Sequence, residues 1–81
     1  MADMEQSIDR VLDAKGLNCP LPVLKTRKAL RDVPLGNLLK VLATDPASAI
    51  DIRHFCNVSG HELIESSEAD GVYTYVIRRT Q

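Results

Sequence analysis

A nearly continuous aliphatic run, LLKVLAT at residues 38–44, restricts the possible folds of this 81-residue chain more than any other segment. Its short apolar length favours a strand over a helix, and the run lacks the alternation of a strand with one solvated face. It therefore predicts a strand buried on both faces. A chain of this length has room for one sheet covered by one or two helices. We expect a single domain over residues 1–81, with residues 1–7 as a flexible start.

The first predicted helix runs from Pro20 or Pro22 to about Asp32. Side chains suited to a core recur in this segment at i, i+3 and i+7, the spacing of an amphipathic helix. These side chains are Val23, Thr26 and Leu30, with Ala29 and Val33 on the same side. The segment VPLGN then ends the helix.

Asp45 followed by Pro46 predicts the start of a second helix. The carboxylate can cap free N–H groups, and proline fits the first helical position. We expect this helix to run to about Cys56 and Gly60 to stop it. Its apolar stripe comprises Ala49, Ile52 and Cys56, with Phe55 beside them.

Three further segments have the composition of strands, namely IDRVLDA at residues 8–14, HELIES at 61–66 and VYTYVIRR at 72–79. The last two are predicted to form a hairpin that turns at Ala69, Asp70 and Gly71. The order is then β-α-β-α-β-β. Alternating strands and helices favour crossover connections of one hand. The predicted fold is an α+β two-layer sandwich, with a four-stranded mixed sheet and both helices on one face.

The composition argues against several classes of function. Two tyrosines, one phenylalanine and no tryptophan offer no stacking platform for bases, and a formal net charge of −1 gives no overall attraction for nucleic acid. We therefore expect no direct nucleic-acid binding. The N-terminal segment has no apolar run of signal-peptide length, and no later segment is long enough to cross a bilayer. We expect a cytoplasmic protein without membrane contacts, and a monomer.

Cys19 stands directly before a helix that opens with two prolines, in GLNCPLPVLKTRK at residues 16–28. Pro20 disfavours helical geometry for Cys19, which should leave the sulfur exposed at or before the first turn. The positive end of the helix and the cations along it should lower the pKa of this thiol. Because Pro20 and Pro22 lack N–H groups, the effect should be moderate. Two cysteines are too few for a disulfide framework, so we expect free thiols.

The face of this helix opposite the core combines apolar and basic side chains, here called the docking strip. It consists of a row of Leu21, Leu24, Lys28 and Arg31, flanked by Lys25 and Arg27. Because the strip adjoins Cys19, it predicts a surface with apolar anchors and a cationic rim that recognises an acidic partner. A solvated charged face is the alternative.

Three segments, in order and at matching spacing, resemble the TusA-like (SirA-like) sulfur carriers over about residues 10–79. They are LDAKGLNCPLPVLKTRKAL, VLATDPASAIDIRHF and GHELIE. That family has a Cys-Pro-x-Pro motif after its first strand. The resemblance therefore implies that Cys19 is the catalytic cysteine, which carries a persulfide, and that Asn18, Pro20 and Pro22 support it. It also implies the fold derived above and no metal or organic cofactor.

The function that the resemblance implies is a cytoplasmic sulfurtransferase acting as a relay. Cys19 would accept sulfur from a cysteine desulfurase, with the loop at Asp45 helping to contact that enzyme, and pass it to a cysteine of an acceptor protein. Members of the family serve tRNA 2-thiouridine synthesis, molybdoenzyme maturation or sulfur oxidation. The member that acts in tRNA thiolation has an acidic residue between the prolines, where this chain has Leu21. The acceptor therefore stays open.

Two other functions compete with the relay. The chain could be a noncatalytic regulatory module that binds a partner through the docking strip, or a thiol redox sensor that pairs Cys19 with Cys56. Cys56 lies on the apolar stripe of the second helix, and we expect it in the core. A zinc site of His54, Cys56 and His61 is not expected, because His54 and Cys56 point to different helix faces. A Cys–His hydrolase is not expected either, since neither histidine is near Cys19 in the chain.

Overall fold

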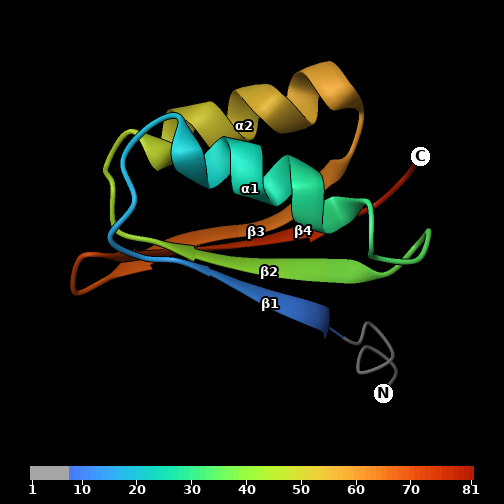
Figure 1. Ribbon diagram of the computed structural model, residues 1–81, viewed down its shortest axis with the longest axis horizontal. Helices are drawn as coiled ribbons and strands as arrows, with labels where there is room; N and C mark the ends of the chain where they lie inside the picture. The colour runs from blue at the N-terminus through green and yellow to red at the C-terminus, as the bar shows by residue number, and fades with distance from the viewer. Residues whose placement is uncertain (1–7) are drawn as a thin grey trace.

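The computed structural model describes residues 8–81, so residues 1–7, predicted as a flexible start, lie outside the described part (Figure 1). The elements are β1 (Ile8–Ala14), α1 (Leu21–Leu30), β2 (Leu38–Ala43), α2 (Ser48–Ser59), β3 (Glu62–Ala69) and β4 (Val72–Arg78). The predicted order β-α-β-α-β-β is confirmed.

The four strands form one mixed sheet in the order β1-β2-β4-β3. β1 and β2 pair in parallel, whereas β4 is antiparallel to both of its neighbours, β2 and β3. The connection through α1 therefore joins adjacent strands, and α2 carries the chain to the opposite edge of the sheet. The terminal hairpin then returns β4 to the place between β2 and β3.

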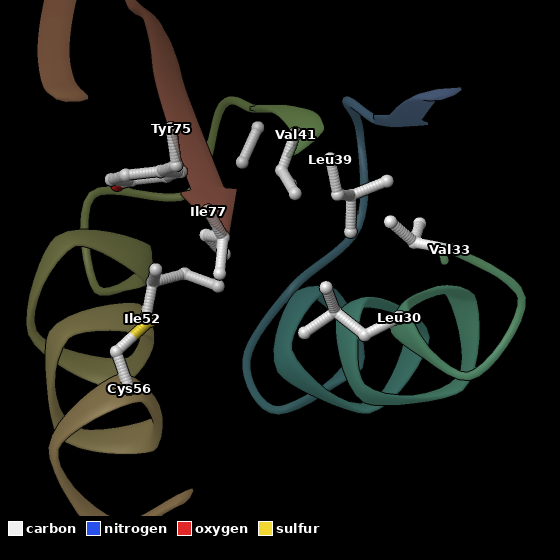
Figure 2. Packing of buried hydrophobic residues seen from close by; sticks show 9 residues of the cluster. Leu30, Val33, Leu39, Val41, Ile52, Cys56, Tyr75 and Ile77 are labelled. Carbon is white, nitrogen blue, oxygen red and sulfur yellow. The ribbon is translucent and has the colours of Figure 1, made fainter. Parts of the chain in front are cut away.

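Both helices cover the same face of the sheet, as predicted, and the core lies between the two layers (Figure 1). Figure 2 shows the buried cluster, which consists of Leu30, Val33, Leu39, Val41, Ala43, Ile52, Cys56, Tyr75 and Ile77. The prediction that the aliphatic run is buried on both faces is wrong, because both helices cover one face and Lys40 and Leu42, on the other face, are only half-buried. Leu39 faces the helices, and its neighbour Leu38, which points to the other face, is only 3% exposed.

α1 buries the stripe that contains Pro22, Thr26 and Leu30. The Thr26 hydroxyl donates a hydrogen bond of 2.7 Å to the carbonyl oxygen of Pro22, so this buried polar group is satisfied. Val23, predicted for the same stripe, packs against the core from a half-buried position. α1 thus holds its first turn tightly on the sheet, directly after Cys19.

α2 begins later than predicted, at Ser48, after a cap at Ala47 whose side chain makes no hydrogen bond. The prediction that Asp45 caps this helix is wrong. One Asp45 oxygen accepts the N–H of Cys19 at 2.6 Å, and the other accepts the N–H of Ala47 at 3.1 Å. The helix continues past Cys56 to Ser59, and Gly60 ends it at a φ of 88°, a conformation that glycine adopts without steric cost.

The first turn of α2 is fixed to the sheet by a buried hydrogen bond. The hydroxyl groups of Ser48 and Tyr75 lie 2.7 Å apart, and both residues are essentially inaccessible to solvent. Ala49, predicted for the apolar stripe, is only half-buried. A polar pair, and not an apolar side chain, therefore sets the position of this turn on β4.

Candidate functional site

The strands β1 and β2 finish, and the helices α1 and α2 begin, at the same end of the molecule (Figure 1), and Cys19 is in the loop between β1 and α1. Two hydrogen bonds join the loops there. The N–H of Gly16 donates to the Thr44 hydroxyl at 2.9 Å, and the N–H of Cys19 donates to Asp45 at 2.6 Å. The carboxyl ends of parallel strands are the usual place for ligand binding in layered α/β folds. The topology therefore puts Cys19 at an edge suited to chemistry.

The predicted exposure of the Cys19 thiol is confirmed, and the thiol is free. The Cys19–Pro20 peptide bond is cis. The main-chain oxygens of Asn18 and Pro20 accept the N–H groups of Leu21 and Leu24, at 2.8 and 3.1 Å. The residues of the motif thus form the turn that leads into α1, while the sulfur stays at the surface.

The predicted direction of the Cys19 pKa is wrong, because the pKa is raised. The largest cause is a hydrogen bond with the Asp51 carboxylate, followed by partial loss of hydration and by the negative charges of Asp51 and Asp45. Nearby negative charge disfavours the thiolate. Two carboxylates thus raise the pKa of the thiol, while the first turn of α1 has lost N–H donors to its prolines.

Asp51 is the residue of the site that the sequence reasoning missed. It lies in the first turn of α2, where an acidic side chain is ordinarily explained by the helix dipole. No motif or spacing links it to Cys19. The two residues meet because the loops before α1 and α2 are tied together through Asp45.

A groove between α1 and α2, called here the inter-helix groove, opens beside Cys19 and has a volume of about 340 Å³. Its apolar lining comprises Val23, Phe55 and Val58, and its polar lining comprises Arg27, Asp51 and His54. His54 therefore shares the groove with Cys19, although it is distant in the chain. Among the hydrogen bonds of residues 8–81, none joins His54 to Cys19.

The four cations of the docking strip lie on two different sides of α1. Its two leucines, Leu21 and Leu24, are 44% and 49% exposed. Lys25 and Lys28 turn toward β1 and line a small hollow with Leu12. Arg27 and Arg31 turn toward α2. The strip is therefore not one uniform surface, and of its four cations only Arg27 lines the inter-helix groove.

The residues considered for zinc lie apart in the fold. Cys56 is in the core, where burial raises its thiol pKa to about 11, and His61 packs against Phe55 with ring centres 5.9 Å apart. Within residues 8–81, no group of three or more His, Cys, Asp or Glu side chains is arranged to hold a metal ion. No helix in the same part of the chain has the length and apolarity needed to span a membrane.

The family model described as sulfurtransferase TusA matches residues 10–79. The chain belongs to the TusA family. It is 51% identical over 76 residues to a sulfur carrier protein TusA of Pseudomonas aeruginosa, covering 94% of this chain and 96% of the relative. It is 49% identical over 75 residues to the protein of the same name from Pseudomonas fluorescens, covering 93% and 90%. The family resemblance predicted from the motifs is thus confirmed.

A solved structure agrees with this family. A SirA-like protein from Desulfitobacterium hafniense has the same fold, with a TM-score of 0.77 and 28% identity, over 89% of this chain and 99% of that one. As a member of the TusA family, the chain is a sulfurtransferase of the sulfur-carrier type. A carrier of this type implies partner proteins that supply and receive the sulfur.

Proposed function

We propose that this protein carries sulfur as a persulfide on Cys19, which receives it from a cysteine desulfurase and passes it to a cysteine of an acceptor protein. The observation that supports this proposal is the contrast between the two thiols. Cys19 is exposed at the head of the inter-helix groove, whereas Cys56 is only 5% exposed within the core. A partner's sulfur can therefore reach Cys19 and not Cys56.

Each transfer is a thiol–persulfide exchange. The Cys19 thiolate attacks the terminal sulfur of the donor persulfide, the donor's S–S bond breaks, and the donor leaves as a thiolate that takes up a proton. Cys19 then holds the extra sulfur. In the second transfer the acceptor's thiolate attacks that terminal sulfur, and Cys19 is restored as a thiol. No external oxidant or reductant is needed.

The surroundings of Cys19 suggest how partners reach it. Asp45 holds the Cys19 main chain through its N–H, which limits the positions of the sulfur. The exposed leucines of the docking strip offer apolar contacts beside the sulfur, and its four cations offer attraction for an acidic surface. We assign Arg27 the largest share of this attraction, because it lines the groove that contains Cys19.

The acceptor is proposed to belong to a pathway that the family serves, such as tRNA 2-thiouridine synthesis or molybdoenzyme maturation. Leu21 occupies the position between the two motif prolines and is 44% exposed. An acceptor that docks there meets an apolar side chain beside the sulfur. We therefore expect a complementary apolar contact on the acceptor at this point.

Intact-protein mass spectrometry after incubation with a cysteine desulfurase and L-cysteine tests the proposal. We expect a reductant-labile gain of one sulfur atom in the wild-type chain and in Cys56→Ala, and no gain in Cys19→Ser. Loading of Cys19→Ser would overturn the proposal. So would absence of loading in the wild type while the same desulfurase loads another acceptor, a result that would favour the regulatory module.

The redox-sensor alternative finds less support in the fold. Cys56 would have to leave the core to pair with Cys19, and burial raises its pKa to about 11. A thiol that is both buried and protonated reacts slowly in disulfide exchange.

A further inference from the structure

A second hollow, with a volume of about 330 Å³, lies where α1 and α2 end. Four of its lining side chains are basic, namely Arg27, Arg31, Arg79 and His61, and we call it the cationic hollow. Phe55 and Val58 supply part of its apolar lining. Among the described residues, no Asp or Glu side chain lines it. Gln81, the last residue of the structure, also lines it, and its main-chain carboxylate accepts from Arg79, so the three arginines still outnumber the negative groups. Its chemistry therefore suits an anionic group attached to an apolar or peptide-like body.

The cationic hollow is continuous with the inter-helix groove, because Arg27, Phe55 and Val58 line both. Cys19 lies at the start of α1, and Arg31 follows the last residue of the helix. An α-helix rises about 1.5 Å per residue, so the path from the sulfur to the cationic hollow is about 15 Å long. One groove thus joins a reactive thiol to a basic site.

The Arg79 guanidinium is held in place before any ligand arrives. Nη1 donates to the main-chain oxygens of Arg31 at 3.3 Å and Val33 at 2.8 Å, and Nε donates to the Gln81 oxygen at 2.9 Å. Within residues 8–81, Nη2 has no such acceptor. A fixed planar guanidinium with donors left over binds a carboxylate with little loss of side-chain entropy.

His61 adds a donor to the same hollow without adding charge. Its Nδ1 accepts the N–H of Thr80 at 3.2 Å, which assigns the ring proton of the neutral form to Nε2. Burial and the charge of Arg79 lower the pKa of His61, so the ring is neutral near pH 7. The positive charge of the hollow therefore comes from its arginines.

We propose that the cationic hollow binds a carboxylate of the protein that exchanges sulfur with Cys19. The occupant is an Asp or Glu side chain in an extended segment of that protein, whose cysteine reaches the sulfur at the other end of the groove. Extended residues advance about 3.3 Å each, so the carboxylate lies about five positions from the cysteine, with about four residues between them. The inference rests on the proposed function, because it takes Cys19 as the reacting atom.

Model peptides test the inference without a natural partner. An acetylated, amidated peptide carries cysteine as a mixed disulfide with nitrothiobenzoate, then four glycines, then Asp. A second peptide, which completes the first pair, carries Asn in place of Asp. Another Asp and Asn pair has the same residues in the reverse order, with the cysteine last. The Cys19 thiolate attacks the peptide's sulfur, a new disulfide forms, and coloured nitrothiobenzoate leaves. Its absorbance gives the rate constant with the full-length chain.

We expect the Asp peptide of at least one pair to react about fivefold faster than its Asn counterpart at low salt. The preference should vanish in about 1 M salt, where screening is nearly complete. It should also vanish when one glycine replaces the four. Equal rates for Asp and Asn in both pairs at low salt would overturn the inference.

Variants of the chain distinguish binding of the peptide carboxylate in the cationic hollow from attraction to the overall charge of the protein. Arg31→Gln and Arg79→Gln should each remove most of the preference for Asp. Lys40→Gln removes the same charge from β2, on the sheet face opposite the helices, and should leave the preference intact. An equal effect of Lys40→Gln and Arg31→Gln would overturn the inference in favour of a general electrostatic effect. Arg31→Gln keeps the test valid if Arg79→Gln fails to fold.

The peptide rates do not depend on persulfide loading. If the chain fails to load sulfur but prefers the Asp peptide, the proposed function fails and the carboxylate site stands. If the chain loads sulfur and shows no preference, the inference alone fails.

Discussion

The Cys19 sulfur is exposed, yet its surroundings favour the thiol over the thiolate. The Asp51 carboxylate is its hydrogen-bond partner, and Asp45 adds a second negative charge. Arg27 and His54 are the basic residues that line the same groove. A mostly protonated thiol resists oxidation and alkylation, while the thiolate that does form is a strong nucleophile. Such a balance suits a carrier that must survive between partners.

Replacing Asp51 by Asn should lower the pKa of Cys19, because the negative charge beside the sulfur is lost. We expect the rate of Cys19 alkylation by iodoacetamide to rise severalfold near pH 7, and its pH profile to move to lower pH. Peptide mass spectrometry separates Cys19 from Cys56. Asp9→Asn, which removes an acid from β1, is the matched control. An Asp51→Asn profile that coincides with wild type would contradict this assignment.

Cys56 should make the fold less stable in alkaline solution. Burial raises its pKa from 9.0 to about 11, so the folded chain keeps this proton to a higher pH than the unfolded chain does. Its contribution to the free energy of unfolding is complete below pH 9 and is lost as the pH rises toward 11. Urea unfolding across this range should show a shallower decline for Cys56→Ala than for wild type. Identical declines would show that Cys56 does not contribute.

At the scale of the elements, local patterns in the sequence were sufficient to predict the helix α1 and the strand β2. Thr26 and Leu30 recur with helical spacing, and the run around Leu39 and Val41 is apolar whatever lies next to it. The start of α2 was not predictable in this way. Asp45 can accept hydrogen bonds from the helix after it or from another loop, and the choice depends on which N–H groups the fold brings near. The meeting of Asp51 with Cys19 follows from the same nonlocal contact.

The Ser48–Tyr75 hydrogen bond should account for a measurable part of the stability that α2 gains from β4. Tyr75→Phe leaves the buried Ser48 hydroxyl without its partner and should reduce the free energy of unfolding by about 1–2 kcal/mol. Chemical denaturation gives this value. Ser48→Ala combined with Tyr75→Phe should recover part of the loss, because neither group is then unsatisfied.

Tyr73→Phe is the matched control for this measurement, since Tyr73 is on the same strand and is only half-buried. Equal losses for Tyr73→Phe and Tyr75→Phe would mean that the bond to Ser48 has no special role in positioning the first turn of α2.

For the whole molecule, the last strand is the one that completes the sheet. β4 pairs with both β2 and β3 and brings Tyr75 and Ile77 into the core. A chain that ends at residue 69 should therefore show no cooperative thermal unfolding by circular dichroism, whereas a chain that lacks only residues 80–81 should unfold cooperatively. A sharp transition in the shorter chain would show that β1, β2 and the helices form a stable unit without β4.

The position of Cys19 at one end of a groove between α1 and α2 also determines the order in which partner proteins can bind. A protein bound in that groove covers the sulfur, so donor and acceptor must bind one after the other, as in a ping-pong reaction. Turnover then depends on how quickly each partner dissociates, and very high affinity for either partner slows turnover. Exposed arginines raise the association rate of a partner and still allow rapid dissociation. This combination suits a carrier that must release each partner after the sulfur is transferred.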